Sequence, residues 1–310
     1  MRTATKIKAA WKVIHAGLDT RRPLLAQMVI TKRCNLSCGY CFEYDKVSKP
    51  VPLQVLKSRV DELKRLRVVF VTLNGGEPLL HPEIVTLTKY IQENGMIPMI
   101  NSNGWLLKPE LINQLNKAGL FGIQISCDGL EDNEITRKSM RRLRPKLEML
   151  KEHADFKVRI NCVLGAGNPQ DVVDVAKIVM SYDFDFQCSL VRDAEGSALL
   201  LDLETQKAYL EIRKLKGRLP KALHDSFQLP LVKGQSIDWK CRSGARYFHL
   251  DAEGMVHYCQ PRTGAPNKRI EDYTVEDILE SFYKEKSCSK RCPHAYAHIG
   301  SRMDKYRRQA

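Results

Sequence analysis

The stretch Leu24-Leu-Ala-Gln-Met-Val-Ile-Thr-Lys-Arg-Cys34-Asn-Leu-Ser-Cys38-Gly-Tyr-Cys41 joins an apolar run to a loop that carries three cysteines. The apolar run, residues 24–30, has the length and composition of a buried strand. Three thiols on one loop can hold three corners of an iron–sulfur cluster and leave the fourth iron without a protein ligand. An open coordination position is typical of catalytic metal sites. A zinc site is the alternative, but the loop offers no fourth Cys or His.

Apolar runs alternate with helical periodicities across residues 24–190. Helices are indicated between these runs by apolar spacings such as Leu53, Leu56, Val60 and Leu63, and by prolines at helix starts. This alternation predicts an α/β fold with a parallel sheet and right-handed crossovers. Ligands of such sheets bind at the carboxyl ends of the strands, where the cysteine loop falls. The six expected strands are residues 24–30, 68–73, 96–100, 121–126, 157–163 and 184–190.

The cysteine loop resembles that of the radical S-adenosylmethionine enzymes. The spacing Cys34-x3-Cys38-x2-Cys41, with Tyr40 before the last cysteine, matches the family motif, and Asn74-Gly-Gly-Glu-Pro78 matches its GGEP motif. The resemblance implies a partial (β/α)6 TIM-like barrel over residues 24–195. It also implies a [4Fe-4S] cluster on the three cysteines, with S-adenosyl-L-methionine bound to the unique iron. Reductive cleavage of this cosubstrate would then yield a 5′-deoxyadenosyl radical.

Further polar residues at the expected strand ends are candidate cosubstrate contacts. Gly75 and Gly76 would let backbone approach the ligand closely, and Glu77 could accept a hydrogen bond from its ammonium group. Members of the family commonly carry Ser-Leu-Asp-Gly at the fourth strand, where this chain has Ser126-Cys-Asp-Gly129. Ordinary turn chemistry is the alternative for these strand-end residues. The predicted contacts are Tyr40, Gly75, Gly76, Glu77, Pro78, Ser102, Asn103, Ser126, Asp128 and Asn161.

A second set of four cysteines lies near the other end of the chain, at Cys241, Cys259, Cys288 and Cys292. The spacing Cys-x12-Gly-x4-Cys resembles the SPASM and twitch extensions of the same family, which hold auxiliary iron–sulfur clusters. With no cysteine after Cys292, the twitch form and a second [4Fe-4S] cluster are the better match. A hairpin signal at residues 246–259 indicates a small α+β domain over residues 239–292. A structural zinc site with four cysteine ligands is the alternative.

The remaining segments carry weaker signals. Residues 1–23 predict an amphipathic helix with Ile7, Trp11, Ile14 and Leu18 on one face. We expect this helix to pack on the main domain, and peripheral membrane contact is the alternative because the helix is also basic. Residues 196–238 read as a helical linker and residues 293–310 as a basic tail, in which His294 and His298 read as ordinary residues. Three single cysteines in apolar runs, Cys127, Cys162 and Cys188, are expected in the core.

The amino-acid composition limits where in the cell the protein is expected and which classes of partner it is expected to bind. No window approaches the ~18 to 20 apolar residues of a transmembrane helix. Ten cysteines clustered in two groups are poor evidence for a secreted disulfide framework, so we expect a cytoplasmic protein. The net charge of +14 favours acidic partners without choosing among them. Nucleic acid is an unlikely partner, because basic residues are dispersed and no RNA-binding module is recognisable.

The sequence therefore predicts a radical S-adenosylmethionine enzyme that abstracts hydrogen from an organic substrate. A small metabolite is favoured over a peptide or a lipid-linked substrate, because few residues precede the first strand. An electron donor such as a flavodoxin or a ferredoxin is expected. The alternatives are an RNA- or peptide-modifying enzyme of the same kind and, from another class, a non-enzymatic, zinc-stapled basic binding protein.

Overall fold

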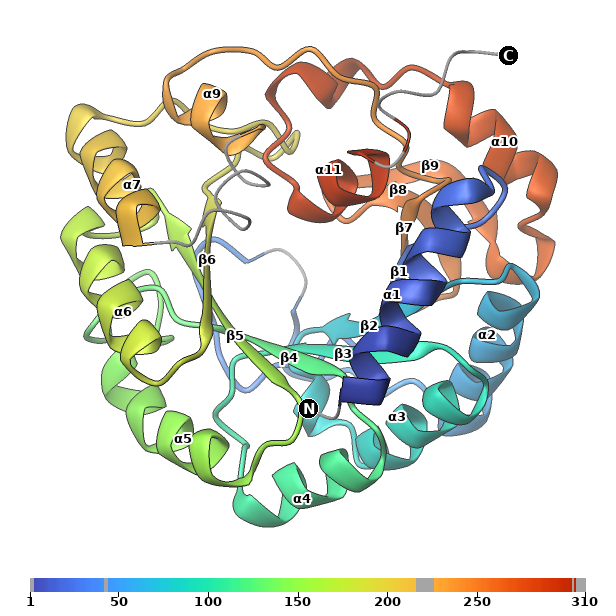
Figure 1. Cartoon of the computed structure of the whole chain (residues 1–310), viewed down its shortest axis with the longest axis horizontal. Helices are drawn as coiled ribbons and strands as arrows, with labels where there is room; N and C mark the ends of the chain where they lie inside the picture. Colours follow the sequence, from blue (N-terminus) through green and yellow to red (C-terminus); the bar gives the residue numbers. More distant parts are fainter. Residues whose placement is uncertain (1–2, 42–43, 216–225, 303, 305–310) are drawn as a thin grey trace.

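A curved sheet wrapped on its outside by helices forms the frame of the molecule (Figure 1). The computed structural model describes residues 3–41, 44–215, 226–302 and 304. Its strands are β1 (Leu25–Thr31), β2 (Phe70–Gly75), β3 (Ile97–Ser102), β4 (Gly122–Ser126), β5 (Lys157–Leu164), β6 (Asp185–Leu190), β7 (Tyr247–Leu250), β8 (Met255–Cys259) and β9 (Arg262–Arg269). Its α-helices are α1 (Thr3–Leu18), α2 (Leu53–Arg65), α3 (Ile84–Glu93), α4 (Pro109–Lys117), α5 (Met140–His153), α6 (Pro169–Ser181), α7 (Leu203–Leu215), α9 (Gln228–Val232), α10 (Val275–Tyr283) and α11 (Ala295–Arg302).

The nine strands of this sheet follow the order β6-β5-β4-β3-β2-β1-β7-β8-β9. Strands β1 to β6 pair in parallel, each with its sequence neighbour, and helices connect them as predicted. All six expected strands are confirmed, with ends that differ from the prediction by at most two residues. The sheet does not close, which fits a partial barrel. The fold is therefore a mixed α/β architecture with a mostly parallel, open sheet.

The predicted hairpin is confirmed as β7 and β8, and it extends the sheet at β1. Strand β7 pairs in parallel with β1, while β8 and β9 continue as antiparallel neighbours. Strand β1, which leads into the cysteine loop, is therefore flanked on both sides and lies inside the sheet. The helix α10 begins with a capping box in which Thr274 and Asp277 satisfy each other's backbone N–H groups.

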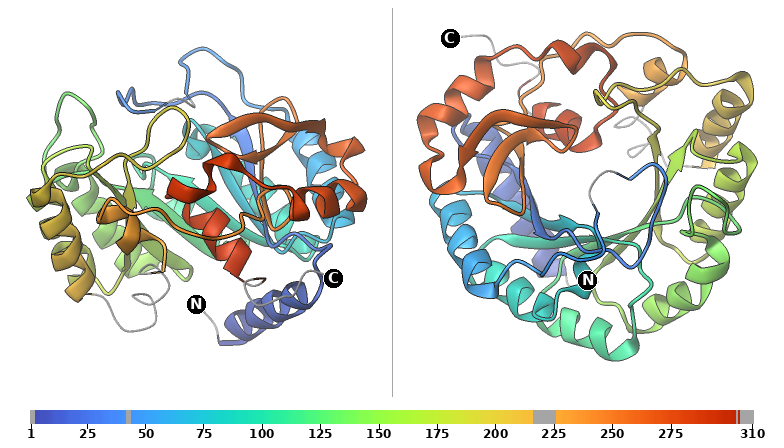
Figure 2. Two further views of the ribbon diagram at one scale, coloured as in Figure 1. Left: turned by 90° about the horizontal axis from the view of Figure 1, so that it is seen from above. Right: turned by 180° about the vertical axis from the view of Figure 1, so that it is seen from behind.

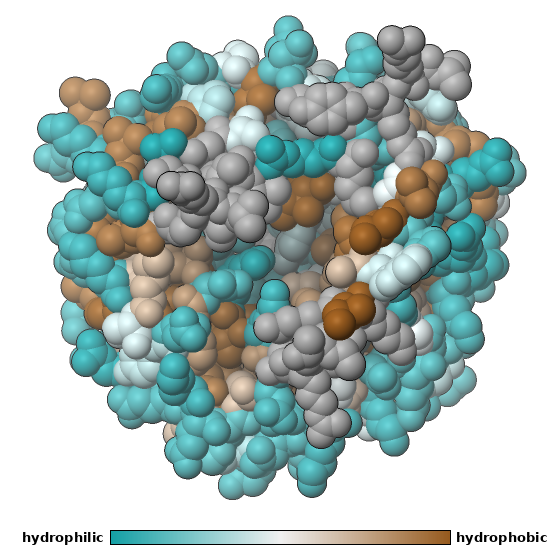
Figure 3. All heavy atoms as spheres, viewed as in Figure 1, coloured by the Kyte–Doolittle hydropathy of each residue, from teal (hydrophilic) through white to brown (hydrophobic). Residues whose placement is uncertain are grey.

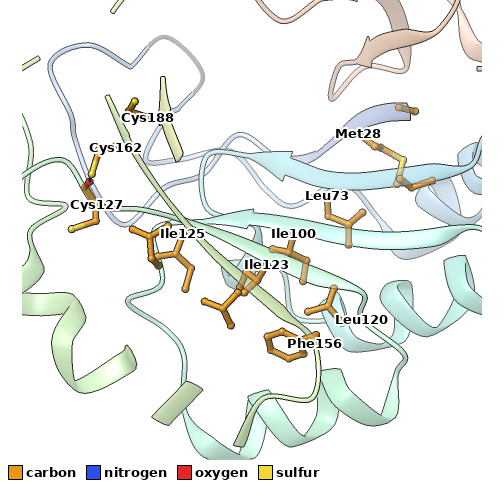
Figure 4. Packing of buried hydrophobic residues seen from close by; sticks show 14 of the residues in the cluster. Met28, Leu73, Ile100, Leu120, Ile123, Ile125, Cys127, Phe156, Cys162 and Cys188 are labelled. Carbon is orange, nitrogen blue, oxygen red and sulfur yellow. Dashed lines mark hydrogen bonds between the residues drawn. The ribbon is translucent and has the colours of Figure 1, made fainter. Parts of the chain in front are cut away.

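The hydrophobic core lies between the sheet and its covering helices, as Figure 4 shows for part of it. Fully buried side chains such as Met28, Leu73 and Ile100 come from successive strands of the sheet. The single cysteines Cys127, Cys162 and Cys188 are also fully buried there, which confirms the prediction that they are core residues. Burial raises the pKa of Cys127 to about 12, so this thiol is neutral and packs as a small apolar group.

Helix α1 forms within the predicted segment and packs on the main domain as expected, but the apolar stripe that the sequence shows is not the face that packs. Ala9 and Ala16 face inward and form a buried cluster with Leu24, Val69 and Ile97. The small alanines allow the helix axis to approach the amino ends of the strands closely. The predicted apolar stripe instead faces solvent, along the side of α1 that Figure 3 shows. The exposed fractions are 57% for Ile7, 60% for Trp11, 59% for Ile14 and 72% for Leu18.

Helix α11 fills the side of the barrel that the sheet leaves open, between β6 and β7 (Figure 1). His298 anchors it, with its ring stacked at centroid distances of 4.2 Å from Phe227 and 3.7 Å from Trp239. The predicted basic tail therefore begins with a packed helix, and residues 303 and 305–310 of the tail lie outside the described residues. Across the part of the chain that the structure describes, every helix is too short or too polar to serve as a membrane span.

Candidate active site

The cysteine loop lies directly against the end of β2, and two glycines make this contact possible. Gly76 donates a backbone hydrogen bond of 2.9 Å to the carbonyl of Thr31, and Glu77 donates one of 2.9 Å to Arg33. A Cβ atom on Gly76 would lie 2.4 Å from the carbonyl oxygen of Lys32, far inside van der Waals contact. Gly75 adopts a φ of +136°, and a Cβ there would lie 2.0 Å from the Thr31 oxygen. The two glycines thus allow the end of β2 to contact the segment that leads into the cysteine loop. Their predicted approach to a ligand stays a prediction.

Glu77 is fully buried and joins the ends of β2 and β3. Its carboxylate accepts hydrogen bonds from the backbone N–H of Leu79 at 2.9 Å, the backbone N–H of Asn103 at 2.7 Å and the Ser102 hydroxyl at 2.7 Å. Burial raises its pKa, while these three hydrogen bonds act in the opposite direction. A carboxylate offers about four acceptor positions, so one position remains for another donor. The Asn103 amide also donates to Asn35 in the cysteine loop at 2.7 Å, which ties the loop to β3.

Tyr40 and Asp128 join the cysteine loop to the end of β4. The Tyr40 hydroxyl donates to Asp128, and it accepts a hydrogen bond of 3.0 Å from the Lys138 ammonium group. Thr136 also donates to Asp128, at 3.2 Å, and its hydroxyl lies 3.5 Å from the Cys38 sulfur. Burial alone would lower the pKa of Lys138, but Tyr40, Asp128 and Cys38 together raise it well above its ordinary value. Lys138 is therefore a cation held beside the cysteine loop.

Sequence reasoning missed Lys138 and Thr136, which sit in an irregular segment between β4 and α5. That segment has neither a motif nor a periodicity to single them out. The predicted residues Ser126 and Asn161 do lie together, because they are register partners in the β4–β5 pair. Asn161 accepts a hydrogen bond of 2.8 Å from Ser189 on β6 and lines a cavity.

This cavity, of about 250 Å³, is enclosed by β4, β5, β6 and the start of α11. A smaller cavity of about 170 Å³ shares Tyr40, Arg192 and His294 with it and reaches Cys41. The sequence signal for this lining is the alternation of polar residues along each strand, such as Gln124 and Ser126 on β4, because alternate residues of a strand point to the same face. The lining of the larger cavity is Tyr40, Gln124, Arg159, Asn161, Val163, Gln187, Ser189, Leu190, Val191, Arg192, Pro293, His294, Ala295, Tyr296 and Ile299.

The second cysteine set gathers around β8 and the segment before α11. Cys241, Cys259 and Cys292 are buried, and burial raises the pKa of each thiol, that of Cys259 to about 12. Charge interactions among the four members, Cys288 included, raise these values further, so the thiols lie within electrostatic range of one another. Beside them, burial lowers the pKa of Lys286 to about 8.

The donor chemistry of both cysteine sets suits iron–sulfur clusters, which take thiolate ligands and are tuned by N–H···S hydrogen bonds. Cys34 accepts such a bond from the N–H of Leu36, and Cys292 accepts one from His294, each at 3.4 Å. Among the described residues, no group of three or more His, Cys, Asp or Glu side chains is arranged to hold a metal ion as it stands. The ligand roles of the seven cysteines therefore stay predictions.

Residues 28–179 match the family model described as the Radical SAM superfamily. This range contains the three-cysteine loop, the glycine pair against it and the strands from β2 to β5. The chain contains a radical SAM domain. The matched range of the radical SAM domain ends before β6, so the second cysteine set and α11 lie beyond it.

Two curated relatives align with about half of this chain. The PqqA peptide cyclase of Bradyrhizobium diazoefficiens is 32% identical over 170 residues, which are 53% of this chain and 44% of that protein. The AdoMet-dependent heme synthase of Methanosarcina barkeri is 29% identical over 163 residues, which are 49% of this chain and 46% of that protein. The chain thus spans less than half the length of either relative.

A solved structure extends the likeness beyond the radical SAM domain. Native anSMEcpe with bound AdoMet and Cp18Cys peptide superimposes with a TM-score of 0.61 at 17% identity. The superposition covers 92% of this chain and 96% of that one. At this identity the likeness establishes the fold alone, including the course of the chain past the radical SAM domain.

Proposed function

We propose that this chain is a radical S-adenosylmethionine enzyme that abstracts hydrogen from an organic substrate. The observation that carries the proposal is the packing of the Cys34–Cys38–Cys41 loop on Gly75 and Gly76 at the carboxyl edge of a radical SAM domain. The three cysteines would hold a [4Fe-4S] cluster together with S-adenosyl-L-methionine. When bound, these groups supply reductive cleavage of the cosubstrate to a 5′-deoxyadenosyl radical.

The chain's own residues would position and enclose the cosubstrate. Glu77 fixes the ends of β2 and β3, and its remaining acceptor position suits the cosubstrate's ammonium group. Tyr40 and Asp128 hold the cysteine loop against β4, with Lys138 as their cationic partner. We assign Ser102, Asn103, Ser126 and Asn161 to cosubstrate contact or to the support of such contacts, because they end or line the same edge of the sheet.

For the second cysteine set, we propose an auxiliary [4Fe-4S] cluster of the twitch type on Cys241, Cys259, Cys288 and Cys292. The burial of three of these thiols and their electrostatic coupling support a shared cation. Strand β8 ends at Cys259 and is separated from β1 only by β7, so this site would be held rigidly beside the barrel. Structural zinc is the competing occupant.

A peptide is the better supported substrate class. The PqqA peptide cyclase aligns over more than half of this chain, and the structure with nearly full mutual coverage holds a peptide. The likeness to a heme synthase supports a small molecule as the second candidate. We propose that the electron needed for cleavage comes from a protein such as a flavodoxin or a ferredoxin.

Anaerobic purification and cluster reconstitution test the proposal. We expect about eight irons per chain, as two four-iron clusters require, and 5′-deoxyadenosine after reduction with S-adenosylmethionine. Formation of 5′-deoxyadenosine should be abolished in Cys34→Ala, Cys38→Ala and Cys41→Ala. The matched control is Cys188→Ala, which removes a core thiol that belongs to neither cysteine set and should still form 5′-deoxyadenosine. Zinc with negligible iron would contradict the enzyme proposal. Formation of 5′-deoxyadenosine in the three loop variants would contradict the site assignment.

The auxiliary site needs its own readout. Cys241→Ala and Cys259→Ala should lower the iron content to about four per chain while the first cluster keeps its spectroscopic response to S-adenosylmethionine. If these variants keep about eight irons, the second set does not hold a cluster.

A further inference from the structure

The charges around the two cavities are all of one sign. Arg159 and Arg192 line the larger cavity, and Arg192 also lines the smaller one. Among the described residues that line either cavity there is no aspartate or glutamate. The remaining polar lining consists of neutral hydrogen-bonding groups, such as Gln124, Gln187 and Ser189. A cavity of this composition favours an anionic ligand.

Arg192 forms no ion pair with an aspartate or glutamate among the described residues, although its charge lowers the pKa of the nearby Cys259 thiol. Its guanidinium group donates to the side-chain oxygen of Gln260, which is neutral, and it has no ion pair with a described residue. Arg159 lies 3.5 Å from Asp185, in a pair whose side chains are 37% and 59% exposed. Exposed pairs of this length contribute little, so Arg159 still adds positive potential to the cavity. It is the register partner of Asp185 at the start of β6, whereas Arg192 follows the end of that strand, so Arg192 is the arginine at the edge that carries the cysteine loop.

His294 offers the cavity a hydrogen-bond acceptor. The Tyr247 hydroxyl donates its hydrogen to Gln27 and lies 3.3 Å from His294 Nε2, so Nε2 carries the hydrogen in the neutral ring. The other ring nitrogen, Nδ1, is then an acceptor. It is fully buried and has no hydrogen-bond partner among the described residues. An unsatisfied buried acceptor of this kind favours a ligand that brings a donor.

We propose that the cavity binds a carboxylate group of the substrate, with Arg192 as its cationic partner and His294 Nδ1 as acceptor for an N–H or O–H of the same molecule. This inference rests on the proposed function. The carboxylate can belong to an acidic residue of a peptide or to a small molecule, which share this chemistry. No lysine and no glycine lines the described walls, so the backbone cradle and point charges typical of phosphate sites are lacking, which favours a planar carboxylate.

Binding measurements on the reconstituted full-length chain with S-adenosylmethionine present test the carboxylate site. The probes are glutarate with its neutral diamide, and the capped peptides acetyl-Ala-Ala-Glu-Ala-Ala-amide and acetyl-Ala-Ala-Gln-Ala-Ala-amide. We expect each acidic probe to bind about tenfold or more tightly than its neutral twin, as loss of a charged hydrogen bond implies. Arg192→Gln should remove that preference. Arg269→Gln, an exposed arginine on β9, should keep it. Tighter binding of the acidic peptide indicates a carboxylate from a peptide residue, and tighter binding of glutarate indicates one from a small molecule. Either result supports the carboxylate site.

Three outcomes separate the possible failures. Equal binding of acidic and neutral probes by the native chain overturns the carboxylate site. If Arg192→Gln weakens S-adenosylmethionine and leaves the acidic probes unaffected, Arg192 serves the cosubstrate and the inference is overturned. If 5′-deoxyadenosine never forms, the proposed function fails, while the binding preference still reports on the carboxylate site.

A second probe pair addresses His294. L-Glutamate adds an ammonium donor to the glutarate skeleton, so we expect the native chain to prefer it over glutarate. His294→Phe keeps a planar ring of similar size but removes the acceptor, and it should abolish this preference while retaining the preference for glutarate over its diamide. An unchanged preference for L-glutamate would remove His294 from the site.

Discussion

Arg246 and Asp304 form a bidentate ion pair in the interior, with Nε–Oδ2 and Nη2–Oδ1 distances of 2.7 and 2.8 Å and no exposed side-chain surface. The third guanidinium nitrogen donates to the carbonyls of Ala16, Asp19 and Arg22, at 2.6 to 2.8 Å. One side chain thus joins the end of α1, the approach to β1, the start of β7 and residue 304.

We expect Asp304→Asn to destabilise the protein by about 3–5 kcal/mol, because it leaves a buried guanidinium charge without its partner. Chemical unfolding of the native and variant chains measures this difference. The matched control is Glu253→Gln, which breaks an exposed pair with Lys32 and should cost less than about 1 kcal/mol. Equal effects of the two substitutions would contradict the structural role of the buried pair.

Gly76→Ala should displace the cysteine loop, because the added methyl group meets backbone oxygens that cannot move independently of the loop. We expect a loss of about 1–3 kcal/mol in stability and a fall in iron content after reconstitution. Gly39→Ala, in the same loop, places its methyl group 3.8 Å from the nearest atom and should bind iron like the native chain. Iron and sulfide assays with thermal unfolding measure both effects. Normal iron content in Gly76→Ala would show that the contact is not required.

Stability should fall as the pH falls below about 6.5, the ordinary histidine pKa. Burial lowers the pKa of His249 to about 4, so the native state resists a proton that the unfolded chain accepts. The stabilisation is present above the unfolded value and is lost as the pH falls toward the folded one. Between pH 7 and pH 5 we expect this residue to account for about 2 kcal/mol.

Urea unfolding at a series of pH values measures this dependence. His249→Gln should reduce the loss of stability between pH 7 and pH 5 by about 2 kcal/mol. Part of the slope should remain, because burial also lowers the pKa of His294 to about 3 and that of His298 to about 4. His15→Gln, at an exposed position on α1, is the matched control and should leave the curve unchanged. A slope that is identical in all three chains would rule out His249 as its source.

The two faces of α1 should respond oppositely to substitution. Ile14→Ser lies on the exposed face and should change the free energy of unfolding by less than about 0.5 kcal/mol. Ala16→Leu overfills a fully buried position and should cost about 1–3 kcal/mol. Thermal unfolding compares the two variants.

Flotation with anionic vesicles tests whether the exposed stripe contacts membranes. If the native chain, Ile14→Ser and Trp11→Ser float with the vesicles to the same extent, the stripe has no membrane role.

Strong periodicity made the barrel predictable. Each parallel strand is a continuous apolar run between helical segments, and the cysteine and Gly-Gly-Glu-Pro motifs follow two of these runs directly. Helix α1 was predictable as a helix but not in its orientation. Alanine carries little hydropathy signal, so the sequence could not show that Ala9 and Ala16 would pack inward in place of the larger apolar residues.

The cavity lining was harder to predict for a different reason. Arg159 and Gln187 lie within strands that are otherwise apolar, and their orientation depends on how the sheet curves. Helix α11 was missed because its packing uses the stacked ring of His298 and small residues such as Ala297, none of which forms an apolar stripe. These contacts join segments that are far apart in the chain, so no local pattern could reveal them.

Helix α11 gives the molecule a practical route to altered specificity. A combinatorial library over the cavity-lining residues Pro293, Ala295 and Ile299 would reshape one wall of the cavity and keep His298, which anchors the helix. Figure 2 shows this short segment beside the barrel opening and α1 at the opposite end from the cysteine loop. Diversification can therefore be confined to three positions on one short segment of the chain.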